Sequence, residues 1–484
     1  MRILYLDIDT LRPDHLGCYG YHRRTSPNID ALAAGAVRFD KCYVSDAPCL
    51  PSRASLFTGQ FGIRSGIVGH GGTAADARIM GPERRFRTDE QRTPWIMAFD
   101  MNNWHTCTFS TFAHRHSAWW FYAGWREVHN CGKHGHERAD EVIPGAIEWL
   151  KANGKKDNWV LHVHVWDPHT PFRTPEDFAN PFENEPVDPW YTEEMRQKQW
   201  DDFGASGVRE PAGSLNTFKG TKLQPGEISS MAQYKRYVDS YDMGIAYADM
   251  HAGRMFNAMA DMGILDDTVI MISSDHGELF GELGVIGDHS TADNITSRVP
   301  MILKAPGISG ARVDDALHYQ NDLAATTLEM AGIGIPGDWD GASILPSLRA
   351  GKSQGRDHVV FSQCAWSCMR GVRWDDNVLL RTYHTGLKRL PARMLFNVAA
   401  DPHETNNLAD SQPALADHGQ ALLESWTAQM LAKSPSCVDP MWTAISEGGP
   451  WHTRGKLEFY CKRLRESGRA QHADFLEKHP NGLA

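Results

Sequence analysis

The chain has 484 residues, enough for about three domains of average size or for one large domain and a smaller one. Its 49 basic and 60 acidic side chains leave a net charge of −11, which disfavours a nucleic-acid-binding protein because such proteins are usually basic over the binding domain. Nine cysteines with no Cys-x-x-Cys pair argue against a disulfide framework and against a structural zinc site.

In chain order, the first predicted elements alternate between strand and helix. Strands are predicted over residues 2–9, 159–166 and 268–273, with a short helix over residues 29–36 and a long helix over residues 235–262. Unbroken apolar runs are typical of strands buried on both faces, and the long helix places apolar residues at steps of three and four. Because all three strands run into ionisable residues, the pattern predicts an α/β sheet with functional groups at the carboxyl ends of its strands.

The composition changes near residue 350, where a linker over residues 350–355 is followed by short β-like runs. The later predicted elements are β-like runs over residues 358–362, 377–384 and 394–398 and a helix over residues 413–431. We therefore predict a catalytic domain over residues 1–353 and a C-terminal domain over residues 354–484. The second domain is expected to hold a small antiparallel sheet with a helix.

The remaining sequence is less patterned. Residues 172–221 are rich in Pro, Trp and acidic residues and are predicted to form a long insertion near the mouth of the large sheet. No element is predicted for the tail over residues 437–484. No apolar run approaches the roughly 18 residues of a membrane span, and the first one, residues 3–6, is shorter than a signal-peptide core of about 7 residues. We therefore expect a cytoplasmic protein.

The most informative stretch is Pro48-Cys49-Leu50-Pro51-Ser52-Arg53, which continues to Gly59. A helix that begins near Ser52 would place Cys49 at a helix N-terminus, where backbone N–H groups and the helix dipole favour anions. Arg53, one turn later, adds a fixed positive charge. The residues alone leave two readings open, an anion site around Cys49 or a buried free cysteine before a helix.

Cys-x-Pro-Ser-Arg followed by Leu-x-Thr-Gly resembles the signature of type I sulfatases in the alkaline phosphatase superfamily. Further stretches occur in the order of that family: its N-terminal metal strand, its histidine loop, its second metal pair and its link to the C-terminal subdomain resemble residues 7–20, 167–171, 274–278 and 395–408. The resemblance implies an alkaline-phosphatase-like fold, in which helices sandwich a large mixed, mainly parallel sheet beside the small C-terminal sheet.

The resemblance also implies a divalent cation held by Asp9, Asp275, His276 and the residue at Cys49. Carboxylates supply the oxygen ligands that hard cations prefer, and the histidine nitrogen leaves Mn²⁺ or Mg²⁺ open beside Ca²⁺, the usual ion of the family. Members of the family carry two adjacent acids on the first strand, whereas Asp9 is followed by Thr10, whose hydroxyl is a weaker ligand. We expect Ca²⁺.

In the family that this sequence resembles, the cysteine that corresponds to Cys49 is converted by a maturation enzyme to formylglycine, whose hydrated aldehyde is the nucleophile. The resemblance implies that Arg53 holds the geminal oxygens and that His169 donates a proton to the leaving-group oxygen. The covalent sulfate adduct is then released by elimination. A formylglycine-generating enzyme is therefore an expected partner.

The sequence departs from the family at both of its substrate-binding lysines. The first lysine and a nearby histidine fall by count on Thr111 and Ala113, and the candidates to replace them are His114, Arg115 and His116. The second lysine falls on His289, which Asp288 would favour in its protonated form. We include His289 as a sulfate-binding cation. His70, in a glycine loop, is either a pocket residue or a turn residue.

The sequence thus predicts a formylglycine-dependent sulfatase that hydrolyses a sulfate ester. Aromatic residues over residues 119–122 and at Trp125, Trp190 and Trp200 favour a small sulfated saccharide as substrate, although core or subunit contacts would use the same residues. Two alternatives stay open: a phosphonate monoester or phosphodiester hydrolase of the same superfamily, and a non-catalytic binder of sulfated glycans with unmodified Cys49. We expect no nucleic-acid or membrane partner, and the sequence leaves a homo-oligomer open.

Overall fold

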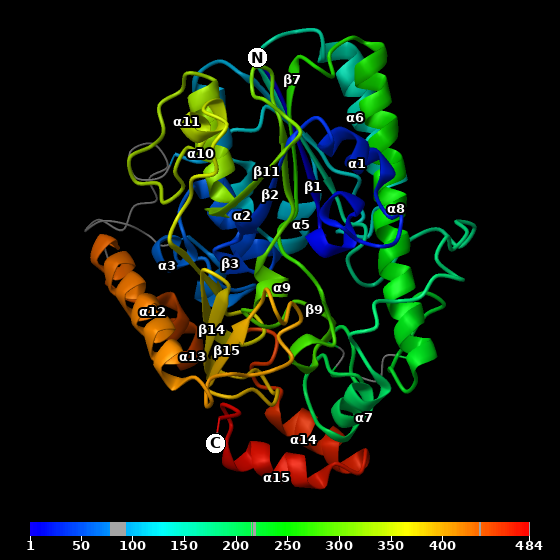
Figure 1. The fold of residues 1–484 in the computed structure, drawn as a ribbon, viewed down its shortest axis with the longest axis vertical. Helices are drawn as coiled ribbons and strands as arrows, with labels where there is room; N and C mark the ends of the chain where they lie inside the picture. Colours follow the sequence, from blue (N-terminus) through cyan, green and yellow to red (C-terminus); the bar gives the residue numbers. More distant parts are fainter. Residues whose placement is uncertain (78–92, 214, 216–218, 435–436, 484) are drawn as a thin grey trace.

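The computed structural model describes all residues except 78–92, 214, 216–218, 435–436 and 484. Within the described residues, the large sheet has eight strands in the order β11-β2-β10-β7-β1-β6-β4-β5 (Figure 1). They are β1 (Arg2–Ile8), β2 (Val37–Tyr43), β4 (His105–Phe109), β5 (Glu127–His129), β6 (Trp159–Val165), β7 (Thr268–Ser273), β10 (Met301–Lys304) and β11 (Arg312–Tyr319). Neighbouring strands are parallel except at β10, which is antiparallel to β2 and β7. The predicted mixed, mainly parallel sheet is confirmed.

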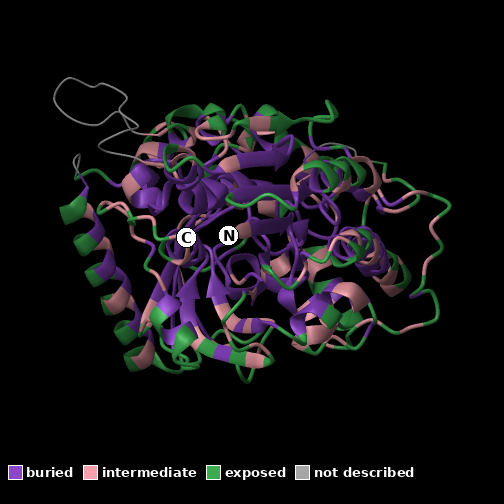
Figure 2. Ribbon diagram, turned by 90° about the horizontal axis from the view of Figure 1, so that it is seen from above, coloured by how far each residue is buried: buried purple, intermediate pink, exposed green. Residues whose placement is uncertain are grey.

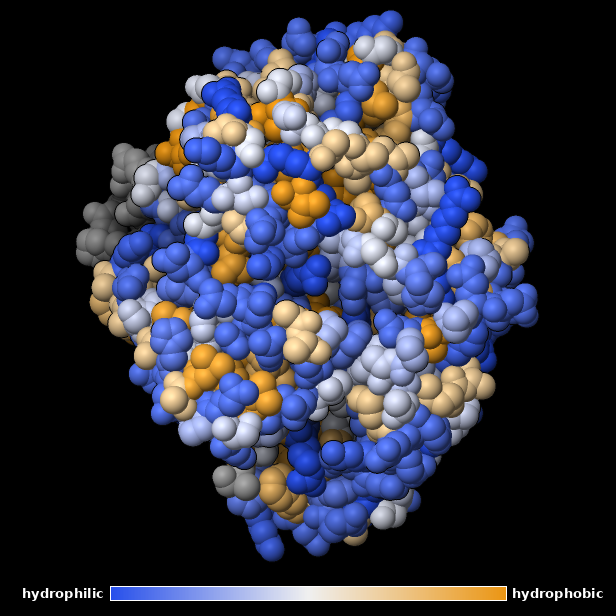
Figure 3. Space-filling model, in the orientation of Figure 1, coloured by the Kyte–Doolittle hydropathy of each residue, from blue (hydrophilic) through white to orange (hydrophobic). Residues whose placement is uncertain are grey.

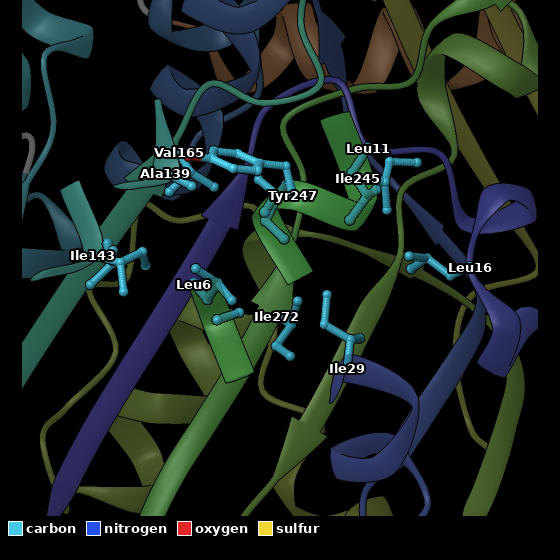
Figure 4. Packing of buried hydrophobic residues seen from close by; sticks show 14 of the residues in the cluster. Leu6, Leu11, Leu16, Ile29, Ala139, Ile143, Val165, Ile245, Tyr247 and Ile272 are labelled. Carbon is cyan, nitrogen blue, oxygen red and sulfur yellow. The ribbon is translucent and has the colours of Figure 1, made fainter. Parts of the chain in front are cut away.

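Alternate residues of β1 pack into two hydrophobic cores, one on each face of the sheet. Leu4 and Leu6 contribute to the first core. Its residues labelled in Figure 4 come from the sheet, from helices α1 (Pro27–Ala33), α6 (Ala139–Asn153) and α8 (Met231–Asp261), and from the segment between β1 and α1. Ile3 and Tyr5 contribute to the second, with helices α2 (Cys49–Thr58), α4 (Trp95–Met101) and α10 (Asn321–Met330). Figure 2 shows buried strands at the centre and exposed residues on the outer helices. Covering both faces leaves the strand ends as the place for ionisable groups.

A second sheet, of five strands among the described residues, carries a strand from near the start of the chain. Its order is β15-β14-β13-β12-β3, in which β3 (Asp46–Ala47) pairs parallel to β12 (His358–Gln363). The other three strands, β13 (Cys368–Trp374), β14 (Asn377–His384) and β15 (Arg393–Asn397), continue the sheet in antiparallel pairs, with α12 (Pro413–Lys433) packed against it. Since β3 ends two residues before Cys49, this sheet also positions the start of α2.

Shorter elements complete the chain. The tail forms α13 (Pro440–Ser446), α14 (Leu457–Glu466) and α15 (Ala470–Lys478), the last two at the bottom of Figure 1. The insertion contains α7 (Glu193–Asp201). The remaining short elements are α3 (Gly62–Ser65), α5 (Phe112–His116), α9 (Asn294–Ser297), α11 (Leu345–Arg349), β8 (Leu279–Phe280) and β9 (Ile286–Asp288).

Several element boundaries differ from those predicted. The helix that follows the cysteine begins at Cys49 rather than near Ser52, because the amide of Ser52 already donates to the Pro48 carbonyl at 3.0 Å and closes the first turn. The helix predicted over residues 29–36 is α1, over Pro27–Ala33. It begins earlier because the amide of Asp30 already donates to the Ser26 carbonyl at 2.8 Å and closes the first turn. Asn28 thus lies inside the helix, where its side chain donates to Asp249 of α8 at 2.7 Å.

The face of the molecule seen in Figure 3 is mainly polar. Figure 3 shows hydrophilic residues over most of the visible face, with smaller hydrophobic areas between them. Among the described residues, no helix combines the length and the apolar character that crossing a membrane requires. All nine cysteines lie within the described residues, and none of them forms a disulfide there.

Candidate active site

The carboxyl ends of three neighbouring parallel strands bring acidic and imidazole side chains together. Asp7 and Asp9 come from the end of β1, His164 from β6, and Asp275 with His276 from the turn after β7. The register aligns Asp7 with His164 of β6 and with Ser273 of β7. The predicted position of functional groups at this edge of the sheet therefore agrees with the structure.

Cys49 is the first residue of α2 and lines a cavity of about 800 Å³. Its side chain is almost fully buried, and its Sγ lies 3.4 Å from Nε2 of His276. Burial, together with the charges of Asp9 and Asp275, raises the pKa of the Cys49 thiol well above its usual value. An unmodified thiol at this place is therefore a poor nucleophile, because the reactive form is the thiolate.

Arg53, one turn into α2, is buried among three carboxylates. Its Nε donates to Asp7 Oδ2 at 2.9 Å, and its Nη1 lies 3.1 Å from Asp9 Oδ2 and also donates to Asp275 Oδ2. Its Nη2 lies 2.8 Å from Nε2 of His164. Arg53 is buried and is not among the described residues that line the cavity, so its charge acts on the site from within the protein.

The residues around Cys49 fit a divalent cation. Ligand atoms of Asp9, Cys49, Asp275 and His276 all lie within 4.8 Å of one another, and all four residues are buried. Asp7, Asp9 and Asp275 face the single guanidinium of Arg53, which leaves two buried negative charges in excess. Such an excess is costly unless a cation balances it.

Unpartnered oxygen atoms at the same place support this fit. Among the described residues, Asp9 Oδ1 and Thr10 Oγ1 are buried without a hydrogen-bond partner. Burial, together with Asp9 and Asp7, raises the pKa of Asp275, although Arg53 opposes this. Without a cation the cluster thus tends to hold a proton, which a bound cation would displace.

The two predicted substrate histidines, His169 and His289, both line the cavity. The Nε2 of His169 lies 4.0 Å from Asp9 Oδ1, and its Nδ1 bonds to the carbonyl of Thr170. The ring of His289 lies 3.9 Å from that of His276 and 5.8 Å from that of His169. The structure therefore brings together all seven predicted site residues: these two histidines with Cys49, Asp9, Asp275, His276 and Arg53.

His289 is the cation of this group. Burial alone would lower the pKa of His289, but Glu278, whose Oε1 lies 3.7 Å from Nδ1, and Asp288, at 3.8 Å from Nε2, raise it to about 9. The sequence pointed to Asp288 and missed Glu278. Glu278 and Asp288 thus favour the imidazolium form of His289, in a position where the family has lysine.

The structure also separates the candidates for the other missing lysine. Arg115 and His116 line the cavity, whereas His114 is exposed and packs its ring against His134 at 3.9 Å. Thr111 is used structurally, because its hydroxyl accepts a hydrogen bond from Trp166 at 2.9 Å and donates to Glu137. His70 lines the cavity as well, so it is a pocket residue.

The aromatic residues that favoured a saccharide lie elsewhere. None of residues 119–122, Trp125, Trp190 and Trp200 is among the described residues that line the cavity; Trp366 and Trp451 line it instead. Trp120 and Phe121 are buried in the second core. They therefore have the core role that the sequence analysis kept as an alternative to saccharide binding. The sequence carried no spacing signal for Trp366 and Trp451, because both approach the site from the C-terminal part of the chain.

Asp7 and His164 were also missed, although a signal existed. Asp7 and Asp9 are two apart on one strand, as are His162 and His164 on the next, so each pair faces the same side of the sheet. His162 and His164 occur in the same run that predicted β6. Reading the alternation of ionisable residues within both strands would have identified them.

Cys49, at the N-terminus of α2, lies at the carboxyl edge of a mixed α/β sheet, next to buried carboxylates that suit a divalent cation. This fold and this site are those of a hydrolase of the alkaline phosphatase superfamily. The Sulfatase family model matches residues 2–333, and the model for the N-sulphoglucosamine sulphohydrolase C-terminal region matches residues 282–429. Since the first match covers well over half of the chain, the protein belongs to the type I sulfatase family and is a sulfuric ester hydrolase.

Individual relatives are distant. The N-acetylglucosamine-6-O-sulfatase of Bacteroides thetaiotaomicron is 24% identical over 475 residues, covering 84% of this chain and 82% of the relative. A solved structure in complex with its substrate D-glucosamine-2-N,6-O-disulfate has a TM-score of 0.69 at 19% identity, covering 90% and 99% of the two chains. The phosphonate monoester hydrolase of Agrobacterium radiobacter has a TM-score of 0.67 at 19% identity, covering 89% and 96%. At these identities the structures establish the fold alone.

Proposed function

We propose that this sulfatase hydrolyses the sulfate ester of a small saccharide, using formylglycine at position 49 and a bound Ca²⁺. The observation that carries the proposal is the grouping of ligand atoms of Asp9, Asp275, His276 and Cys49 within 4.8 Å of one another, where Cys49 lines a cavity of about 800 Å³. The saccharide is supported by the sugar substrates in the names of the relative and of the substrate complex described above. The cavity falls within the 300–1,000 Å³ that small-molecule sites occupy.

The cation and the modified residue supply the reactive centre. When bound, a divalent cation would neutralise the sulfate and polarise its S–O bond. Formylglycine would supply, as its hydrate, a hydroxyl nucleophile at the N-terminus of α2. The side chains of Asp9, Asp275 and His276 would hold the cation, and Arg53 fixes the two carboxylates through its Nη1.

Two histidines act directly on the sulfate ester. His289, as imidazolium, binds a sulfate oxygen with a charge-assisted hydrogen bond. The Nδ1 of His169 bonds to the carbonyl of Thr170, so Nδ1 carries a hydrogen. Burial lowers the pKa of His169 well below its usual value, although Asp9 opposes this. Nε2, which faces Asp9, must therefore first take up a proton before it delivers that proton to the leaving oxygen. The overall reaction consumes one water molecule, breaks the bond between sulfur and the bridging oxygen, and yields the alcohol, sulfate and a proton.

Hydrolysis of a phosphonate or phosphate diester is the second candidate. Two observations favour it. Thr111 and His289 stand where sulfatases carry their two substrate-binding lysines, and the phosphonate monoester hydrolase has the same fold as this chain. Parallel kcat/KM measurements on an aryl sulfate and an aryl phosphonate test it. A preference for the sulfate supports the proposal, and a preference for the phosphonate of tenfold or more would replace it with the second candidate.

The modification is tested separately, by mass spectrometry of the peptide that contains Cys49. Protein produced together with a formylglycine-generating enzyme should carry a residue about 18 Da lighter than cysteine. Cysteine that stays unmodified under those conditions would favour the non-catalytic glycan binder. Reconstitution of metal-free protein with Ca²⁺, Mn²⁺ or Mg²⁺, followed by activity measurement, identifies the ion.

A further inference from the structure

Part of the wall of the active-site cavity comes from the C-terminal tail. The two family matches end at residues 333 and 429, yet Trp451 and His452 line the same cavity as Cys49. Trp366, which lies between β12 and β13, lines it beside them. The chain thus adds a segment outside both matches to a site whose catalytic positions all lie within the first match.

The tail is held firmly in this place. Asp439 caps α13 and accepts two hydrogen bonds of 2.7 Å from Arg370 of β13, in a pair that is buried on both sides. Met441 and Ala444 of α13 share a buried apolar cluster with Val68. Because a buried bidentate ion pair is geometrically specific, the position of α13 relative to the cavity is fixed.

The loop that carries His70 is shaped to receive the tail. A Cβ atom added to Gly71 would lie 2.2 Å from the ring of Trp451, so only glycine allows the backbone to approach that ring. At the next residue, Gly72 has a φ of +68°, and Thr73 donates to Glu447, which follows α13. The loop and the tail therefore form one wall.

A chain of hydrogen bonds runs through this wall from the nucleophile helix. The amide of Leu50, next to Cys49, donates to His70 Nε2 at 3.4 Å, and His70 Nδ1 lies 2.9 Å from His452 Nε2. The ring of His452 stacks on that of Trp366 at 4.2 Å, and its own amide donates to the carbonyl of Ala365 at 2.9 Å. Both histidine rings are therefore held in position.

The direction of these bonds fixes the tautomer of His452. A backbone amide only donates, so Nε2 of His70 accepts and its Nδ1 carries the hydrogen that is donated to Nε2 of His452. Burial lowers the pKa of His70 well below its usual value and that of His452 to about 4, so both rings are neutral. The hydrogen of His452 then lies on Nδ1, which has no hydrogen-bond partner among the described residues.

We propose that His452 is a specificity-determining residue, whose Nδ1–H donates to a hydroxyl group of the saccharide from which sulfate is removed. This rests on the proposed function, because the ester must place its sulfate at Cys49 and its alcohol part in the remainder of the same cavity. Trp451 supplies an aromatic ring beside it. A site built to bond a hydroxyl discriminates strongly against compounds that lack one, since its polar group is then left unpaired.

The test compares a sulfated monosaccharide with 4-nitrophenyl sulfate, which has no hydroxyl group. We define the ratio as kcat/KM for the sulfated monosaccharide divided by kcat/KM for 4-nitrophenyl sulfate. His452→Phe, which keeps an aromatic ring against Trp366, should lower this ratio at least tenfold. His452→Asn keeps an N–H donor close to the position of Nδ1 and should recover part of the ratio. Trp442→Phe is the matched control, since Trp442 is an exposed tail residue that does not line the cavity, and it should leave the ratio unchanged.

The outcomes separate this inference from the function on which it rests. An unchanged ratio in His452→Phe, whether activity is kept or is lost equally on both substrates, would overturn the role of His452. If wild-type protein carrying formylglycine hydrolyses neither sulfate, the proposed function fails instead. Calorimetric binding of the sulfated monosaccharide to Cys49→Ala and to Cys49→Ala/His452→Phe then decides: Kd at least tenfold weaker in the double variant supports the inference, and equal Kd values refute it.

Discussion

Replacement of Asp9 by Asn tests the cation and the charge balance of the site together. Asp7, Asp9 and Asp275 surround Arg53, and Asn keeps the shape of the side chain while removing one of the two excess negative charges. We expect Asp9→Asn to bind Ca²⁺ weakly. In the absence of cation it should be at least as stable as wild type, because less charge is left unbalanced in the buried site.

The size of the effect follows from mass action. A cation that binds only the folded state adds about 2.7 kcal/mol at a free concentration 100-fold above Kd. An unfolding entropy of about 2.1 cal/mol/K per residue gives about 1 kcal/mol/K for 484 residues, so Ca²⁺ should raise the Tm of wild type by about 3 °C. The corresponding increase in Asp9→Asn should be close to zero.

Scanning calorimetry of each protein after chelation and after Ca²⁺ addition measures this difference, with metal content determined on the same samples. Asp266→Asn is the matched control, since Asp266 pairs with Lys304 at the surface, and it should show the wild-type increase. A Ca²⁺-dependent rise that persists undiminished in Asp9→Asn would refute the assignment of Asp9. Full activity of a wild-type sample shown to contain no metal would refute the cation itself.

Three further predictions concern the nucleophile, the pH profile and the tail. Cys49→Ala should abolish turnover yet keep its circular dichroism spectrum and Tm; more than about a tenth of the wild-type rate, a loss below about 1.4 kcal/mol, would rule out covalent catalysis at this residue. Because the pKa of His289 is about 9, kcat/KM should fall as the pH rises through that value, His289→Lys should move the fall to higher pH and His289→Ala should remove it; an unchanged alkaline limb in His289→Ala would exclude His289 as the sulfate-binding cation. Asp439→Asn leaves the buried charge of Arg370 unpaired and should cost about 3–5 kcal/mol of unfolding free energy in denaturant titrations. Asp417 pairs with Arg393 at the surface, so the control Asp417→Asn should cost no more than about 1 kcal/mol; equal costs would show that α13 is not anchored by the Arg370–Asp439 pair.

The parts of the fold that the sequence predicted well are those with a strong local pattern. The three central strands are continuous apolar runs, and the long helix keeps one periodicity over 31 residues as α8. Strands β2 and β11 were missed because their polar residues alternate irregularly: β2 mixes Arg38, Asp40 and Lys41 with apolar positions. Their burial is decided by neighbours far away in the chain, which a local pattern does not contain.

The candidate site divides in the same way. Cys49, Asp9, Asp275 and His276 lie next to strand or helix ends, so a motif identified them. His452 has no such context, because its place depends on the Arg370–Asp439 pair and on the packing of α13 against residues near His70. Tertiary contacts of this kind leave no spacing signature, and the tail was accordingly left without a prediction.

The short strand β3 has a consequence for when Cys49 can be modified. In the folded protein this side chain is only 1% exposed, and the strand just before it completes its pairing with Ser362 and Gln363 of β12. The ribosome adds about 300 residues after β3 before it reaches β12, which at 5–20 residues per second takes about 15–60 s of translation. During that time the segment around Cys49 lacks its final partner strand, so the formylglycine-generating enzyme that we propose has a period of tens of seconds in which its target is still an accessible, unfinished part of the chain.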